Sequence, residues 1–179
     1  MKQILSFLCL AILLAACNND QNKTAEPASD AAAPGAEVKL PYSLTMPYNN
    51  WSIGSNENVA AAMNGLKAFV DNDFTALAAT LGDSIVLDFD QLQTKLSRDS
   101  AMKFFTTARA SYKDITIAMD DYVSVISADK KHEWVTLWYK QTWTDPKGVK
   151  DSMNVINDIK LSNGKMVALH EKSSRFQKK

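Results

Sequence analysis

The chain has few of the side chains that most often carry catalytic or metal chemistry. Cysteine and histidine each occur twice among its 179 residues. Cys9 and Cys17 both lie close to the N-terminus, so the rest of the chain offers neither a disulfide nor a thiolate nucleophile. His132 and His170 have no second ligand at helical spacing, which argues against a zinc site. The sequence therefore predicts no metal site and no cofactor.

A net charge and long apolar runs are also lacking. The chain has 20 lysine and arginine residues and 20 aspartate and glutamate residues, so its formal net charge is zero. Such a balance provides no electrostatic surface for nucleic acid. After residue 16, no apolar run approaches the ~20 residues of a membrane-spanning helix. We therefore expect no nucleic-acid partner, and any membrane attachment must come from the N-terminus.

The N-terminal segment has the pattern of an export signal. Lys2 gives a positive start, residues 4–16 are apolar apart from one serine, and the run ends in Leu14-Ala15-Ala16-Cys17. This segment resembles the signal of bacterial lipoproteins, in which the cysteine receives a diacylglycerol and the residues before it are removed. The resemblance implies a signal peptide over 1–16 and an acylated Cys17 that carries palmitate-type chains. An ordinary secretory signal with a chance cysteine is the alternative. Because residue 18 is not aspartate, the family rule implies the outer membrane, on either of its faces.

Composition divides the remaining chain into three parts. Residues 17–37 carry no large apolar side chain and are predicted to form a flexible tether after the lipidated cysteine. Residues 38–55 are rich in aromatic residues and contain two prolines, which excludes a helix or a central strand. This arm is expected either to dock a partner or to lie on the domain formed by residues 56–176. In the second case three aromatic side chains would contact the domain, those of Tyr42, Tyr48 and Trp51.

Hydrophobic periodicity within the domain predicts helices first and strands afterwards. Apolar residues recur at helical spacing early in the domain, whereas alternation dominates after Tyr112. Two turns, Asp145–Gly148 and Asn163-Gly164, separate long strand-like runs. The pattern predicts an α+β domain with three helices packed against a curved antiparallel sheet. The expected elements are helices over 56–70, 74–81 and 97–110, and strands over 85–89, 115–126, 133–144, 149–161 and 166–174.

Three short motifs and this order of elements resemble a known superfamily. The motifs lie at Phe69–Leu77, at Leu81–Phe89 and at Asn163–Val167. They are similar to the helix-break-helix, strand-entry and final-turn patterns of nuclear transport factor 2-like, or SnoaL-like, proteins, over roughly residues 56–176. The resemblance implies a cone-shaped domain in which a strongly curved sheet wraps around a long helix and encloses a cavity. By the same analogy, a homodimer is expected.

The resemblance also suggests where catalysis would take place. Isomerases and cyclases of this superfamily place an acidic base inside the cavity, and Asp88 matches the isomerase base by position. Asn157 aligns with that isomerase's protonated aspartate and can donate a hydrogen bond. The family's tyrosine donor would fall near Gly65, which has no side chain. Alternation along the strand 85–89 instead places its apolar residues on the buried face and Asp88 on the other.

The hairpin around Asp145–Gly148 predicts which side chains line a pocket. A simple register sets Trp138 beside Val155 and Thr136 beside Asn157. An apolar pocket would then contain both tryptophans of this face, Trp134 and Trp138, with Thr136 and Asn157 as polar contacts. The two tryptophans could equally be core residues. A one-residue bulge would put the opposite set on that face, namely Val135, Leu137 and Tyr139.

Two functions from different classes follow from these observations. The first is a non-catalytic envelope lipoprotein that binds a small apolar ligand or a protein partner. The second is an isomerase- or cyclase-type enzyme that uses Asp88 as general base. Glu171 shares a strand face with Val167 and Leu169 and is the carboxylate expected to point inward. The predicted ligand contacts are Trp134, Thr136, Trp138, Asn157 and Glu171.

Overall fold

The computed structural model describes residues 40–175, and the chain divides into two units, Met1–Ser43 and Leu44–Lys179. Every helix and strand of the described residues lies in the second unit. Cys17, the predicted signal over 1–16 and the tether over 17–37 lie outside the described residues. No helix within residues 40–175 is both long enough and apolar enough to cross a bilayer.

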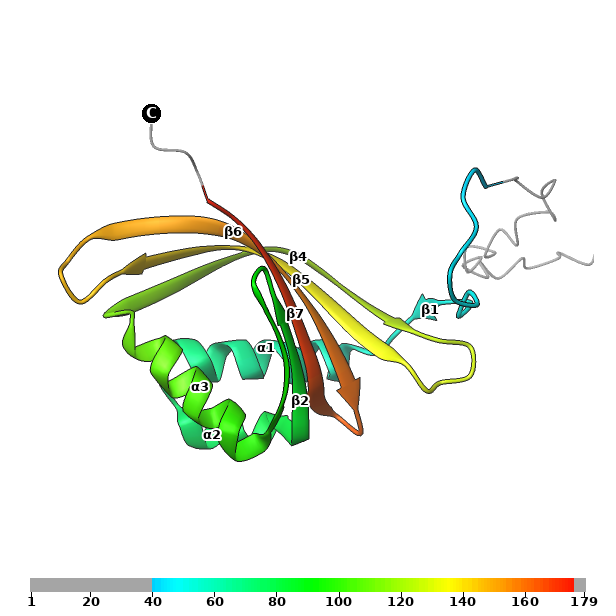
Figure 1. Ribbon diagram of the computed structural model, residues 1–179, viewed down its shortest axis with the longest axis horizontal. Helices are drawn as coiled ribbons and strands as arrows, with labels where there is room; N and C mark the ends of the chain where they lie inside the picture. The colour runs from blue at the N-terminus through cyan, green and yellow to red at the C-terminus, as the bar shows by residue number, and fades with distance from the viewer. Residues whose placement is uncertain (1–39, 176–179) are drawn as a thin grey trace, which may run out of the picture. The chain divides into compact units, whose positions relative to one another are not determined.

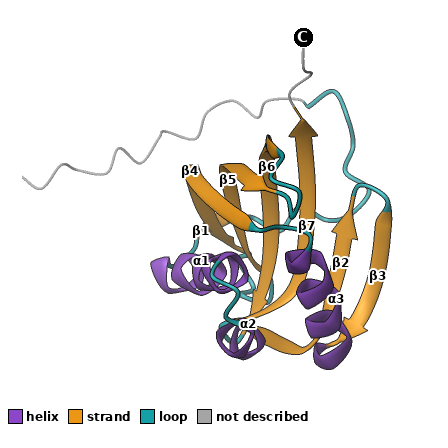
Figure 2. Cartoon of the chain, turned by 90° about the vertical axis from the view of Figure 1, so that its left-hand side faces the viewer, coloured by secondary structure: helices purple, strands orange, loops and turns teal. Residues whose placement is uncertain are grey.

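One curved sheet and a layer of helices form the domain. Within the described residues, seven strands form a sheet in the order β1-β4-β5-β6-β7-β2-β3, and three helices lie against its concave face (Figures 1 and 2). The sheet does not close into a barrel, which confirms the predicted α+β architecture. The elements are β1 (Ser52–Ile53), α1 (Asn56–Val70), α2 (Phe74–Thr80), β2 (Leu81–Phe89), β3 (Leu92–Ser97), α3 (Arg98–Ala110), β4 (Asp114–Ile126), β5 (Glu133–Thr144), β6 (Lys150–Ser162) and β7 (Lys165–Arg175).

Each helix begins at a polar residue that caps it. The side chains of Ser55, Asp73 and Ser97 each accept a hydrogen bond from the backbone NH three residues later, at 3.3, 2.9 and 3.3 Å. These caps fix the starts of α1, α2 and α3 as the sequence predicts. Strand β2 follows α2 without an intervening loop, so the last turn of α2 feeds the chain directly onto the sheet.

The sheet is mixed rather than wholly antiparallel, which corrects the prediction. All neighbouring strands run antiparallel except β2 and β7, which are parallel. A hairpin forces its two strands to be antiparallel, but strands joined through a long connection are free to run either way. Strand β2 is separated from β7 by β3, α3 and the strands β4 to β6, so no hairpin fixes the direction of one relative to the other.

Two local predictions at this end of the sheet are wrong. The first strand was predicted over 85–89, yet β2 begins at Leu81 and includes Gly82 and Asp83. Strand β3 was not predicted, although it pairs with β2 from Ser84↔Ser97 to Phe89↔Leu92. It is an edge strand whose side chains are mostly exposed, so it lacks the hydrophobic alternation by which a strand is recognised.

Only residues 44–55 of the predicted arm belong to the same unit as the domain, and the aromatic side chains of the arm differ in exposure. The side chain of Tyr48 is 60% exposed, and that of Tyr42 is 86% exposed. Trp51 is half-buried, and only the two residues that follow it pair with β4. Asn50, two residues before β1, has a positive φ of 48°, which interrupts the extended backbone on the N-terminal side of this short strand.

Candidate functional site

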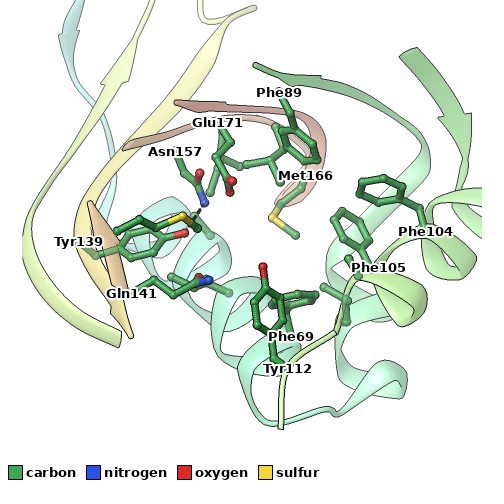
Figure 3. Close-up of a pocket in the computed structure, with 18 residues that line it drawn as sticks. Phe69, Phe89, Phe104, Phe105, Tyr112, Tyr139, Gln141, Asn157, Met166 and Glu171 are labelled. Carbon is green, nitrogen blue, oxygen red and sulfur yellow. Dashed lines mark hydrogen bonds between the residues drawn. The ribbon is translucent and has the colours of Figure 1, made fainter. Parts of the chain in front are cut away.

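A cavity of about 240 Å³ lies between the helices and the concave face of the sheet (Figure 3). Its wall is largely apolar. Helix α1 contributes Leu66 and Phe69, α2 contributes Leu77, and the strands contribute side chains such as Ile159 and Leu169. Six aromatic side chains face this space, those of Phe69, Phe89, Phe104, Phe105, Tyr112 and Tyr139.

The polar part of the wall comes from three neighbouring strands. Gln141 lies on β5 two residues after Tyr139, and Asn157 on β6 pairs with Glu171 on β7. The Asn157 side-chain amide donates a hydrogen bond from Nδ2 to the Tyr139 hydroxyl at 2.9 Å. Asn157 is only 4% exposed, and its Oδ1 has no hydrogen-bond partner among residues 40–175. Figure 3 shows these polar groups together at one side of the cavity.

Glu171 is the acidic group of this polar cluster. Burial, and secondly the negative charge of Asp90, raise the pKa of its carboxyl to about 7. Glu171 takes part in none of the ion pairs formed within the described part of the chain. Around neutral pH this carboxyl therefore exists in both protonation states and can accept or donate a proton.

Burial and the charge of Glu171 raise the pKa of both tyrosines of the cavity, Tyr139 and Tyr112. Burial raises the pKa of the Tyr139 hydroxyl, the charge of Glu171 raises it further, and the hydrogen bond from Asn157 opposes both. Burial and then Glu171 also raise the pKa of Tyr112, against the influence of Arg175. Both phenols thus remain protonated at neutral pH and are available as hydrogen-bond donors.

Asp88 does not line this cavity. It lies on the convex face of the sheet, where its carboxylate is 3.8 Å from the Lys172 ammonium. The apolar neighbours Ile85 and Leu87 occupy the buried face, as strand alternation dictates. The structure therefore separates Asp88 from the enclosed polar groups, and a role as the cavity's base is not compatible with this position.

The register of the β5–β6 hairpin differs by one residue from the simple one. Leu137 pairs with Asn157 and Tyr139 pairs with Val155. A one-residue shift exchanges the two faces of a strand, so the predicted pocket residues of β5 lie on the convex face. These residues are Trp134, Thr136 and Trp138, and none of them lines the cavity.

The convex face gives these side chains other contacts. The Trp134 ring lies edge-on to His170, with 5.2 Å between ring centroids. The Thr136 hydroxyl donates a hydrogen bond to the Asp158 carboxylate at 2.6 Å. Of the predicted ligand contacts, the cavity thus brings together Asn157 and Glu171 only.

Several cavity residues were not singled out from the sequence. Tyr139 appeared only in the bulged alternative for the hairpin, which is the correct one. Phe104 and Phe105 lie in the helix predicted over 97–110, where large apolar side chains favour packing against the sheet, but nothing in the sequence indicated an unfilled space beside them. Gly65 matters for its size, since a Cβ added there would lie 2.5 Å from the Met166 Cε. It therefore lets the Met166 side chain form part of the wall.

Metal binding has no structural support in the described part of the chain. Residues 40–175 contain no group of three or more histidine, cysteine or acidic side chains placed to hold an ion. The cavity wall does supply polar groups of its own. These can hold a ligand by hydrogen bonds and can move a proton at Glu171.

Comparisons with known proteins bear on the fold alone. A scan against protein-family models and a search of curated proteins found no match. Among solved structures, an LEH-like epoxide hydrolase from M. tuberculosis is 13% identical, with a TM-score of 0.54 over 67% of this chain and 84% of that chain. An NTF2-like protein of unknown function from Burkholderia pseudomallei is 13% identical, with a TM-score of 0.55 over 66% and 91%. A protein from Shewanella denitrificans, provisionally named a SnoaL-like polyketide cyclase, is 10% identical, with a TM-score of 0.54 over 65% and 90%. The domain has the nuclear transport factor 2-like, or SnoaL-like, fold.

Proposed function

We propose that this protein is a lipid-anchored envelope protein whose domain binds a small, mostly apolar molecule in the cavity. The observation that carries the proposal is the cavity itself, an apolar space in which four polar side chains, those of Tyr139, Gln141, Asn157 and Glu171, lie together at one side. Ligand sites typically combine an apolar wall with a few fixed polar contacts. The volume of about 240 Å³ is below the ~300–1,000 Å³ of sites for drug-sized molecules, so the ligand is a compact one.

Binding can be tested with a neutral, environment-sensitive dye such as prodan. We expect a saturable rise in fluorescence with one dye bound per chain. Ala108 lines the cavity, so Ala108→Phe should fill part of the space and weaken dye binding at least several-fold. Ala110 on the same helix is exposed and lies outside the cavity, so Ala110→Phe is the matched control. If the wild type shows no saturable binding, or Ala108→Phe binds as the control does, the proposal fails.

The lipid anchor is a separate part of the proposal. It is supported by the sequence pattern that ends at Cys17, which lies outside the described residues. We expect the expressed protein to partition with outer membranes and to incorporate labelled palmitate. Cys17→Ser should abolish the labelling and release the protein from the membrane fraction. An unchanged membrane fraction for Cys17→Ser would remove the anchor from the proposal and leave the binding function untouched.

A proton-transfer enzyme is a second candidate, and one observation favours it. The pKa of Glu171 is raised to about 7, close to the value that suits a general base at neutral pH. Structural neighbours include an LEH-like epoxide hydrolase and a provisionally named cyclase. In such a reaction Glu171, rather than Asp88, would take the proton from water or from a carbon acid.

Styrene oxide, a compact apolar epoxide, is a suitable first substrate for this second candidate. If the candidate is correct, the wild type should convert it to the diol, and Glu171→Gln should lose this activity while still binding prodan. Asp88→Asn, which removes a carboxylate from the convex face, should retain the activity. Dye binding without any diol formation by the wild type would favour the binding function.

A further inference from the structure

The charge of the cavity restricts what can bind there. Glu171 is the one side chain of the cavity wall with a formal charge, and no lysine, arginine or histidine of the described residues lines the space. Asp90 lies close enough to add its negative charge. An anionic ligand would therefore face like charges in a poorly solvated site, where such repulsion is strong. The cavity suits a neutral or positively charged polar end.

Hydrogen bonding restricts the ligand further. The Asn157 Nδ2 donates a hydrogen bond to the Tyr139 hydroxyl. The Asn157 Oδ1 is buried and accepts no hydrogen bond from any of residues 40–175. Glu171 pairs with Asn157 across β6 and β7, so its carboxylate supplies acceptors beside the same point. Buried acceptors without a partner are costly, so they favour a ligand that brings donors. Two acceptors at this point of the cavity, the Asn157 Oδ1 and the Glu171 carboxylate, are therefore open to donors from a ligand, although the Tyr139 hydroxyl beside them is itself a donor.

The opposite wall is aromatic. Figure 3 places Phe69 and Tyr112 across the cavity from Asn157 and Glu171. Phe105 packs edge-on against Phe69, with 6.2 Å between the ring centroids, so the rings are held in place. Aromatic faces attract cations through their quadrupole. Such a wall therefore accommodates both an apolar body and a positive charge.

We propose that the ligand is a small apolar amine, with its ammonium group between Asn157 and Glu171. This inference rests on the proposed binding function and deepens it. A hydroxyl group brings one donor. An ammonium group brings three donors and also a positive charge that pairs with the Glu171 carboxylate. Charge-assisted hydrogen bonds of this kind are also stronger than neutral ones.

Binding of an amine must depend on pH through Glu171. Burial raises the pKa of this carboxyl to about 7, and an ammonium ion stabilises its ionised form. Of the elements around it, β5 presents Tyr139, the chain after α3 presents Tyr112, and the β2–β3 turn presents Asp90. Arg175 follows on β7 itself, while the lining residues of the three helices and of β6 do not titrate. Affinity should therefore rise about tenfold from pH 6 to pH 8, as Glu171 ionises.

Three molecules that share a phenyl ring and differ in the charge of their polar end test the inference: 2-phenylethylamine, 2-phenylethanol and phenylacetate. Calorimetric titrations at pH 8 should show the amine binding about tenfold more tightly than the alcohol, with phenylacetate the weakest. Glu171→Gln should abolish the preference for the amine and its pH dependence, so that the amine binds no more tightly than the alcohol at either pH. Asp88→Asn is the matched control, because it removes a carboxylate from the other face of the sheet, and it should retain both.

The outcomes separate this inference from the function on which it rests. Equal affinity for the amine and the alcohol, or an amine preference that survives Glu171→Gln, overturns the amine inference and leaves the binding function standing. The same holds if prodan binds and none of the three molecules does. If neither the dye nor any of the three binds, the binding function fails as well.

Discussion

The buried carboxyl of Glu171 should make the stability of the domain depend on pH. In the unfolded chain its pKa is near 4.5, and in the folded domain it is about 7. Between these values the folded state binds a proton that the unfolded state has released. The free energy of unfolding therefore falls as pH rises through this window, and it levels off above the folded pKa. Below pH 4.5 the contribution of the protonated group is fully present.

The size of the effect follows from the two pKa values. For a carboxyl with pKa 4.5 unfolded and about 7 folded, the free energy of unfolding should drop by about 2 to 3 kcal/mol between pH 5 and pH 8. Because the side chain retains some exposure, solvent moves the expected value towards the lower end. Such a change is a large part of the 5–15 kcal/mol total typical of a domain.

Urea unfolding at both pH values, on the wild type and on Glu171→Gln, measures this contribution. The glutamine cannot ionise. The free energy of unfolding of the variant, relative to that of the wild type, should therefore rise by about 2 to 3 kcal/mol as pH is raised from 5 to 8. Comparing the two proteins cancels every contribution to the pH dependence that does not involve residue 171. Asp88→Asn is the control and should follow the wild type. Parallel pH profiles for the wild type and Glu171→Gln would refute the assignment of Glu171 as a carboxyl held in an apolar cavity.

Three further substitutions test the cavity wall, the convex face and a link between helices. Gly65→Ala forces the end of Met166 into the cavity, so prodan titration should show at least several-fold weaker binding. In thermal melts, the higher helix propensity of alanine, about 1 kcal/mol, should offset the crowding. Unchanged prodan binding would contradict the cavity wall as described. Trp138→Ala truncates a side chain on the convex face, so the same titration should give an affinity within about twofold of the wild type; loss of binding would argue against the register. Arg109→Ala removes hydrogen bonds of 3.1 and 3.2 Å to the Val70 carbonyl, and urea unfolding should show a loss of about 1–3 kcal/mol; an unchanged midpoint would contradict that role.

The parts of the fold that depend on local interactions could be predicted from the sequence. The caps at Ser55, Asp73 and Ser97 fix the helix starts by side-chain hydrogen bonds that need no tertiary partner. Asn163 and Gly164 both have positive φ, 51° and 69°, which is the conformation that a two-residue hairpin turn requires. In each case the residue type alone indicates the local backbone conformation.

Features that depend on distant partners were missed or only partly predicted. Strand β3 exists because it pairs with β2, and its own exposed side chains carry no pattern. The parallel pairing of β2 with β7 is likewise a property of the assembled sheet. The cavity is the extreme case, since the sequence shows that Phe104 and Phe105 are packed but does not show how much space is left beside them. An empty volume depends on how whole layers meet and not on any one residue.

Whether a side chain lines the cavity or the opposite face depends on the turn at Asp145. Its NH donates to the Val149 carbonyl at 2.9 Å, and the Gly148 NH donates back to the Asp145 carbonyl at 3.0 Å. The loop therefore has three residues, 146–148, with Gly148 at φ 85° in the left-handed region. A type I turn followed by a left-handed glycine forms a hairpin with a bulge, whereas a four-residue loop would leave the simple register.

That single bulge residue determines the chemistry of the cavity. With Thr144 paired to Lys150, every residue of β5 moves to the face opposite from the one that the simple register assigns. Tyr139 then meets Asn157 inside the cavity, and Trp138 lies outside it. The sequence Asp-Pro-Lys-Gly carried this information, because a proline is favoured early in a type I turn and a glycine tolerates the left-handed position after it. The site was therefore encoded in the type of turn that this sequence forms, and the number of residues between the two strands did not reveal it.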